Sequence, residues 1–274
     1  MTKYLIVNAD DFGMCHSANL AIKDLVEKGA ISSTTLISPA SWSFEAVAMA
    51  KADDRFKVGV HLTHTSEWDS YRWGPLSGLD CLKDSEGRFP RSTHEALIIP
   101  LEARMQEALA QIAWCENMGI KIDHLDNHMR TLYDDLEPIL KICAERGWGY
   151  RYPVDSNERF FGKDVHDFVL AKGIATPDYL NPNSNIYVRD CVTQKGDFDS
   201  FRAMIRYLPE GISEFVIHPA LESDELKAIA PDWRIRVHDY QFFASTEFKQ
   251  ILAEENIELI GYQDIKRVRG LEEK

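Results

Sequence analysis

Short apolar runs alternate with longer amphipathic stretches along the whole chain. The apolar runs predict β-strands near 4–8, 31–38, 56–62, 120–126, 148–152, 213–218 and 257–261. The amphipathic stretches predict helices near 16–28, 43–52, 101–118, 134–146, 198–208 and 240–255. Strands that alternate with helices form parallel sheets, so we expect an α/β fold, namely a distorted (β/α) barrel of about seven parallel strands. A doubly wound open sheet is the structural alternative.

Acidic and histidine side chains lie where four of these strands end. They are Asp10 and Asp11 in the first, His61 and His64 in the third, His124, Asp126 and His128 in the fourth, and His218 in the sixth. In a parallel barrel the carboxyl ends of the strands meet on one face, and catalytic groups lie there. An open sheet would not gather four strand ends as readily, so the recurrence favours the barrel and indicates an active site at its rim.

One acid and two imidazoles from these positions suit a divalent metal ion. His124, Asp126 and His128 have even spacing, so they share one face of a strand. With Asp11 and His61 they offer a set of two histidines and one carboxylate, which suits a catalytic divalent ion that keeps positions for water. Such an ion lowers the pKa of bound water and polarises a carbonyl, as hydrolysis of an amide requires. The other acid of the first strand remains available to handle a proton.

Each of these residues has a simpler interpretation when it is taken alone. A buried histidine is more often a hydrogen-bonded core residue than a ligand, and this applies to His61 and to His218. Asp10 and Asp11 also suit the start of the helix that follows them, because acids are favoured at helix N-termini. The hypothesis of an active site therefore depends on their joint occurrence at strand ends.

Composition and charge exclude several other classes. The 274 residues, 45% of them hydrophobic, contain no recognisable linker, so we expect a single domain over 1–274. A net charge of −13 and a pI near 5.2 argue against a nucleic-acid partner. We see no apolar run of membrane-spanning length and no signal-peptide pattern, so no membrane partner is expected. The five cysteines form no CxxC pair and fit reduced thiols, which predicts a cytoplasmic protein; they are Cys15, Cys81, Cys115, Cys143 and Cys191.

Two long connections, roughly 63–100 and 153–197, interrupt the alternation of strands and helices. Loops of this length inside a compact domain are usually functional. Both combine aromatic rings with hydrogen-bonding side chains, for example Trp68, Tyr71, Arg72 and Trp73 in the first and Tyr179, Asn181, Asn183, Asn185 and Tyr187 in the second. Such residues suit contact with a sugar. They equally suit a loop that packs on the barrel, so both interpretations stay open.

Five segments carry a family resemblance when they are taken together. They are LIVNADDFG at 5–13, SSTT at 32–35, GVHL at 59–62, HLDNH at 124–128 and IHP at 217–219. The chain resembles the YdjC-like (ChbG-type) carbohydrate deacetylases from its first strand to about residue 240. The resemblance implies a distorted (β/α) barrel and a hydrolase that removes acetyl groups from N-acetylated sugars, typically small chitin-derived saccharides, with the help of a metal ion.

The resemblance also implies roles for individual residues. Three of them would hold the metal ion: Asp11, His61 and His128. Asp10 would be the general base for the water on that ion, and His218 the acid that protonates the departing amine. Arg151, at the end of the fifth strand, would orient a carboxylate or stabilise the oxyanion. His124 and Asp126 would fix the orientation of the ligands.

Some features stay open at this stage. Mixed nitrogen and oxygen ligands accept several divalent ions, magnesium and zinc among them. The substrate is expected to be an acetylated mono- or oligosaccharide, and a homo-oligomer is compatible with the sequence. The chain has Met129-Arg130 where family members commonly show a second histidine, and His64 stands where a small or apolar residue is expected. Arg130 raises the alternative of an acidic or phosphorylated substrate, and His64 is interpreted as a surface group.

Two other functions compete with deacetylation. One is a different metal-dependent, sugar-processing barrel enzyme, such as an isomerase or a phosphoesterase, although these often use more carboxylate ligands or a second ion. The other is a saccharide-binding protein without catalytic activity. The complete set of candidate catalytic and ligand residues argues against the second alternative.

Overall fold

The computed structural model describes residues 2–152, 154, 162–182 and 198–271. Within these residues the chain forms eight strands: β1 Lys3–Phe12, β2 Ser33–Leu36, β3 Val58–Leu62, β4 Ile122–Asn127, β5 Gly149–Tyr150, β6 Tyr179–Leu180, β7 Gly211–Ile217 and β8 Ile257–Leu259. All of their pairings are parallel. The predicted α/β class with a parallel sheet is therefore confirmed.

The sheet runs in the order β5-β4-β3-β2-β1-β7-β6 and curls into a distorted barrel. Strand β1 is its centre: it pairs with β7 from Lys3 to Ala9, while on its other edge it pairs first with β8 and then with β2. The two ends of the row approach each other where the N–H of Tyr150 donates to the carbonyl of Ala175. Because all strands are parallel, their carboxyl ends meet at one end of the barrel.

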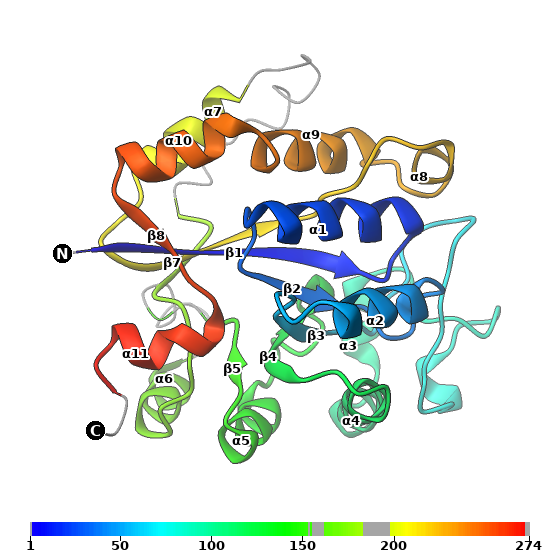
Figure 1. The fold of residues 1–274 in the computed structure, drawn as a ribbon. Helices are drawn as coiled ribbons and strands as arrows, with labels where there is room; N and C mark the ends of the chain where they lie inside the picture. Colours follow the sequence, from blue (N-terminus) through cyan, green and yellow to red (C-terminus); the bar gives the residue numbers. More distant parts are fainter. Residues whose placement is uncertain (1, 153, 155–161, 183–197, 272–274) are drawn as a thin grey trace.

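Helices cover the outside of the sheet, with α1, α7, α9 and α10 on one side and α4, α5 and α6 on the other (Figure 1). The α-helices in the described residues are α1 His16–Lys28, α2 Ser43–Ala52, α3 Thr93–Ile98, α4 Leu101–Asn117, α5 Glu137–Arg146, α6 Gly162–Ala171, α7 Asp199–Arg206, α8 Asp224–Ile229, α9 Trp233–Phe243, α10 Thr246–Glu254 and α11 Ile265–Val268. Short 3-10 helices occur at η1 Asp80–Leu82, η2 His128–Arg130 and η6 Tyr262–Asp264. As far as the described residues show, no helix is long and apolar enough to cross a membrane.

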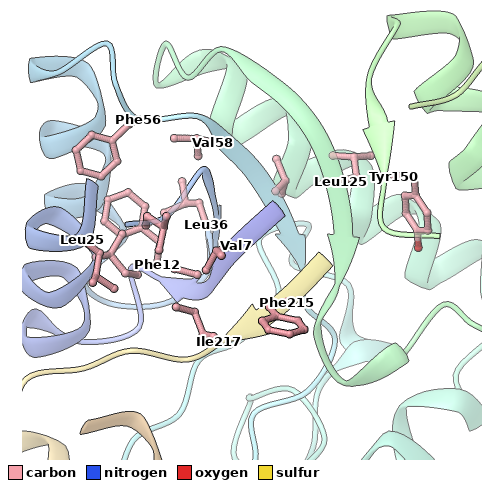
Figure 2. Packing of buried hydrophobic residues seen from close by; sticks show 14 of the residues in the cluster. Val7, Phe12, Leu25, Leu36, Phe56, Val58, Leu125, Tyr150, Phe215 and Ile217 are labelled. Carbon is pink, nitrogen blue, oxygen red and sulfur yellow. The ribbon is translucent and has the colours of Figure 1, made fainter. Parts of the chain in front are cut away.

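Alternate residues of β1 lie in two different environments, one between the sheet and the helices and one inside the barrel. Leu5, Val7 and Ala9 belong to the large cluster that packs against the helices, part of which Figure 2 shows. Ile6 belongs instead to a smaller cluster in the barrel interior. Because side chains alternate along a strand, the next inward position after Ile6 is Asn8. The interior therefore changes from apolar to polar toward the carboxyl ends of the strands.

The connection that follows β3 is held firmly against α4. The buried carboxylate of Glu107 accepts hydrogen bonds from the N–H groups of Leu76 (3.0 Å) and Ser77 (2.9 Å). Gln111, one turn further along, contacts both the N–H and the carbonyl of Thr63 at 2.9 and 2.7 Å. A buried carboxylate on α4 that accepts from two backbone amides of the loop satisfies these polar groups, so the contacts fix the course of the loop over the barrel.

The structure differs from the predicted elements mainly in the second half of the chain. The expected helix at 240–255 is two helices, α9 and α10, because Ser245 caps α10 by accepting a hydrogen bond from the N–H of Phe248. The long connections contain α3, α6 and β6, which the sequence did not predict. Helix α3 begins at Ser92 with a complete capping box. Cys191 and the predicted contacts of Asn183, Asn185 and Tyr187 lie outside the described residues, whereas the other four cysteines are unpaired.

Candidate active site

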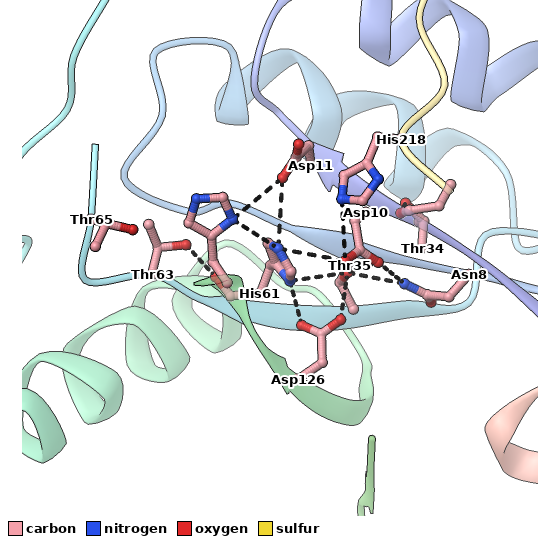
Figure 3. A network of polar contacts seen from close by, with 12 residues as sticks. Asn8, Asp10, Asp11, Thr34, Thr35, His61, Thr63, Thr65, Asp126 and His218 are labelled. Carbon is pink, nitrogen blue, oxygen red and sulfur yellow. Dashed lines mark hydrogen bonds and ion pairs between the residues drawn. The ribbon is translucent and has the colours of Figure 1, made fainter. Parts of the chain in front are cut away.

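Strand β1 ends in a β-bulge that turns two neighbouring acids toward the same space. The register with β2 shifts between Ala9 and Phe12. Asp11 has φ of 66°, a left-handed value that few residues with a Cβ adopt. Successive strand residues normally point to opposite faces, and the bulge removes this alternation. Oδ2 of Asp10 and Oδ1 of Asp11 consequently lie 3.7 and 3.6 Å from Nε2 of His61 (Figure 3).

Asp11, His61 and His128 form a triangle at the carboxyl ends of β1, β3 and β4. Nε2 of His61 lies 3.2 Å from Nδ1 of His128, and Oδ1 of Asp11 lies 3.6 and 3.7 Å from these two nitrogens. Oδ1 of Asp11 is buried, and no donor from the described residues lies within hydrogen-bond distance of it. Three residues from distant parts of the chain thus direct possible ligand atoms to one point.

The triangle has the donors and the dimensions of a metal site. Ligands of zinc lie about 2.0–2.1 Å from the ion, so two ligands of one ion are separated by about 3–3.5 Å. The observed separations of 3.2–3.7 Å are close to this range. Asp10, His61 and Asp126 are also close enough to one another to hold an ion. We favour the first group, because Arg151 already pairs with both carboxylates of the second.

A carboxylate orients His61 from behind. His61 and Asp126 occupy paired positions of β3 and β4, and Nδ1 of His61 lies 2.6 Å from Oδ1 of Asp126. Thr35 donates to the other oxygen of Asp126 at 2.9 Å. A carboxylate that accepts a hydrogen bond from one imidazole N–H leaves the other ring nitrogen available as a ligand. Asp126 therefore lies where the family resemblance implied.

Two residues that the sequence did not single out contact the other two members of the triangle. Oε1 of Glu67 lies 3.1 Å from Nε2 of His128. Arg236, on α9, donates from Nη1 to Oδ2 of Asp11 at 2.7 Å. Neither residue directly follows a strand, so the strand-end pattern that indicates the triangle does not indicate them. Each member of the triangle consequently has its own charged partner on the side away from the shared point.

Asp10 lies next to the triangle and is held by Arg151. The guanidinium donates to both oxygens of the carboxylate, at 2.7 and 2.9 Å. Arg151 also pairs with Asp126 and Glu214 at 2.8 Å each. Burial opposes ionisation of Asp10, but Arg151 and the nearby histidines hold the pKa of its carboxyl well below the usual range. Asp10 is therefore an ionised carboxylate at neutral pH.

His218 approaches Asp10 from the end of β7. Its Nε2 lies 3.9 Å from Oδ2 of Asp10, and its side chain is 40% exposed. Figure 3 shows His218 and Asp126 on opposite sides of Asp10. The N–H of His218 donates to Asp239 of α9 at 2.9 Å, which fixes the backbone at this strand end. A water-accessible imidazole therefore faces an ionised carboxylate across a short gap.

The acids around His61 make this pocket attractive to positive charge. Burial alone would lower the pKa of His61, but Asp126, Asp10 and Asp11 together raise it to about 9. A histidine that binds its proton so tightly compensates for excess negative charge. A divalent cation bound between the same groups would supply that positive charge instead.

His124 does not contact the triangle, although the family resemblance implied that it would orient a ligand. Its ring stacks on Tyr262 with centroids 4.0 Å apart, and its Nδ1 lies 2.5 Å from Asp123. A Cβ added to Gly59 would lie 2.5 Å from Cε1 of this ring, so only glycine leaves room for it. His124 thus shares a strand face with Asp126 but lies one layer deeper in the barrel.

The interpretation of His64 as a surface group is wrong. The residue is fully buried, with Nδ1 3.0 Å from Oγ1 of Thr131 and Nε2 2.9 Å from the carbonyl of Arg104. Burial lowers the pKa of His64 to about 4. Arg130, in contrast, is exposed and has a left-handed φ of 58° directly after Met129, whose φ is 53°. Met129 and Arg130, where family members commonly show a second histidine, therefore form an unusual backbone turn directly after His128.

Comparison with known proteins identifies relatives over nearly the whole chain. The model of the family described as YdjC-like protein matches residues 4–254. Carbohydrate deacetylase 1 of Listeria innocua is 28% identical over 271 residues, which cover 95% of this chain and 99% of the relative. A carbohydrate deacetylase of Brevibacillus brevis is 26% identical over 264 residues, with the same shares of both chains. The predicted family is confirmed, and the relatives' names agree with the predicted class of enzyme, a deacetylase hydrolase.

Among solved structures, an Enterococcus faecalis protein named for cellobiose-phosphate cleavage is similar to this chain with a TM-score of 0.78. The two sequences are 23% identical, and the match covers 96% of this chain and 99% of the other. At this level of identity the match supports the fold. It agrees with the curled parallel sheet described above.

Proposed function

Since the chain belongs to the YdjC-like protein family, we propose that it is a metal-dependent hydrolase that removes acetyl groups from N-acetylated sugars. The substrates we propose are small oligosaccharides of the chitin type. The observation that carries the proposal is the triangle of Asp11, His61 and His128, with separations of 3.2–3.7 Å, beside the ionised carboxylate of Asp10. An ionised carboxylate next to a metal site is the arrangement that hydrolysis of an amide needs.

The three residues of the triangle would hold one divalent ion, either magnesium or zinc. The buried, unpartnered Oδ1 of Asp11 and the two imidazole nitrogens that face it fit such an ion. When bound, the ion supplies Lewis-acid chemistry, which makes water more acidic and a carbonyl more electrophilic. The remaining chemistry belongs to side chains of the protein.

Asp10 acts as the general base in this proposal. Its carboxylate takes a proton from the water that attacks the acetyl carbon. Arg151 donates to both of its oxygens, which fixes its orientation and keeps it ionised. Arg151 pairs with three buried carboxylates, those of Asp10, Asp126 and Glu214, so we assign it the orientation of Asp10 rather than stabilisation of the oxyanion.

His218 acts as the general acid. As the carbon–nitrogen bond breaks, its imidazolium gives a proton to the amine nitrogen, and the products are acetate and a free amino sugar. The position of Nε2, 3.9 Å from Asp10, and the 40% exposure of the side chain support this role. The base and the acid therefore face the same space from two different strands, as proton transfer to two ends of one amide requires.

Release of acetate from N-acetylglucosamine oligomers, with magnesium or zinc added to metal-free protein, tests the proposal. We expect Asp10→Asn to abolish turnover but retain the metal, and His128→Ala to lose the metal itself. Asp54→Asn is a matched control, because this side chain is exposed and precedes β3, at the opposite end of the strand from His61. A fully active Asp10→Asn protein would exclude Asp10 as the base.

The same samples separate the two competing functions. Isomerisation of free sugars or phosphate release without acetate release would identify another barrel enzyme. Saccharide binding without any turnover would identify a binding protein. Acetate that appears in proportion to new amine groups would support the deacetylase, because each cleaved amide yields one of each.

A further inference from the structure

The contact between Glu67 and His128 points to a role for the connection after β3, residues 63–92. His128 is the least enclosed member of the triangle, with 12% of its side chain exposed compared with 2% for each of the other two. It lies in η2 rather than in a strand, and the next two residues have left-handed backbone angles. The barrel itself therefore gives little support to the orientation of this ring.

Glu67 supplies that support from outside the barrel. Its Oε1 lies 3.1 Å from Nε2 of His128, while Nδ1 of the same ring faces His61 and Asp11. If the proton is on Nε2, it is donated to the carboxylate, and the lone pair of Nδ1 points to the centre of the triangle. Asp126 has the same relation to His61, with the two ring nitrogens exchanged. Both imidazoles are thus arranged as ligands by a carboxylate behind them.

The backbone on both sides of Glu67 is firmly held. The N–H of Ser66 donates to the carbonyl of Pro90 at 2.8 Å, and the ring N–H of Trp73 donates to the carbonyl of Thr65 at 3.0 Å. On the other side, Arg91 donates to the carbonyl of Trp68 at 2.9 Å. A carboxylate on such a fixed stretch is in place before any ligand binds, so it loses little entropy in orienting the ring.

The neighbour of Glu67 contacts the partner of a second member of the triangle. The ring of Trp68 lies under the guanidinium of Arg236, with Cζ 5.5 Å from the ring centre. Arg236 in turn donates to Asp11 at 2.7 Å. Of two consecutive residues of the connection, Glu67 therefore contacts His128, and Trp68 contacts Arg236, the partner of Asp11.

We propose that Glu67 is a positioning residue of the metal centre: it fixes the tautomer and the orientation of His128, so that the affinity for the metal depends on the connection 63–92. This inference rests on the proposed function, because it requires a metal at the triangle. Carboxylates that accept a hydrogen bond from a ligating histidine typically contribute about 10–100-fold to metal affinity. We expect a loss of this size when the carboxylate is removed.

The test measures binding of Zn²⁺ and of Mg²⁺ to the metal-free full-length chain by titration calorimetry, with a competing chelator for zinc. Glu67→Ala removes the acceptor, and Glu67→Gln keeps the shape of the side chain but removes its charge. Asp80→Asn is the control, because it removes a carboxylate that is 96% exposed from the same connection. Long-range ¹⁵N–¹H spectra report the tautomer of His128, and urea unfolding of the metal-free proteins reports whether the fold is affected.

We expect Glu67→Ala to bind metal about 10–100-fold more weakly, with Glu67→Gln intermediate and Asp80→Asn unchanged. The Nε2–H signal of His128 should weaken in Glu67→Ala while the unfolding of the metal-free protein stays the same. Undiminished metal binding by Glu67→Ala, with normal binding by the unsubstituted chain, would overturn this inference alone. An unsubstituted chain that bound neither ion would overturn the proposed function as well.

Discussion

The buried imidazole of His64 makes the stability of this protein sensitive to acid. Its pKa falls from 6.5 to about 4 on folding, because burial disfavours the charged form. As the pH drops below 6.5, the unfolded chain takes up the proton first, so the free energy of unfolding decreases. Each pH unit in this window contributes about 1.4 kcal/mol, so His64 should cost about 3 kcal/mol between pH 6.5 and pH 4. Below about pH 4 its contribution stays constant.

Urea unfolding of the unsubstituted chain and of His64→Gln, at several pH values from 7 to 4, measures this contribution. Glutamine can still donate and accept hydrogen bonds but does not titrate. A chelator in all samples removes the separate pH dependence of metal binding. The other titrating groups cancel in the difference between the two proteins. We expect the unsubstituted chain to lose about 3 kcal/mol more than the variant over this range.

Equal losses in the two proteins would refute the reasoning, even if His64→Gln is less stable at pH 7. A lower stability at every pH would reflect only the altered contacts with Thr131 and Arg104. The difference in slope is what reports the buried, neutral imidazole.

Three further predictions concern the stability of the scaffold, and urea unfolding at pH 7 measures each. Glu107→Ala should reduce the free energy of unfolding by about 2–4 kcal/mol, because it removes the charged acceptor of two partly buried backbone N–H groups, whereas the exposed Glu102→Ala should have little effect. Gly59→Ala should cost about 1–3 kcal/mol, because the new methyl group meets the ring of His124 at 2.5 Å; a neutral result would mean that this ring moves freely. Ser92→Ala should cost about 1 kcal/mol through loss of the cap of α3, and a cost as large as that of Glu107→Ala would contradict this estimate of the cap.

The sequence predicts which side chains lie around the triangle because of a general property of parallel sheets, and the family resemblance selects the three members of the triangle among them. Asp11, His61 and His128 each follow an apolar run, and the carboxyl ends of such strands meet. The bulge that brings Asp11 beside Asp10 is a finding of the structure, since the sequence does not specify a left-handed backbone at an aspartate. The sequence pattern therefore predicts which side chains lie at the strand ends. It does not predict the direction in which each side chain points.

Glu67 and Arg236 could not be found in the same way. Glu67 lies in a long connection whose course depends on distant contacts, such as that of Ser66 with Pro90. Arg236 lies in α9, a helix whose buried face includes the charged residues Arg236 and Asp239 because it packs on the site. An apolar stripe is the signal by which sequence patterns reveal helices, and a helix that turns polar residues inward lacks it.

The position of β1 at the centre of the sheet has a consequence for synthesis of the chain. Its partners β7 and β8 come from residues 211–217 and 257–259, so β1 cannot complete its pairing until these far later segments have been synthesised. Contacts between such distant segments slow folding and leave an apolar strand exposed in the meantime. The strand that carries Asp10 and Asp11 is thus the one most in need of protection in the nascent protein.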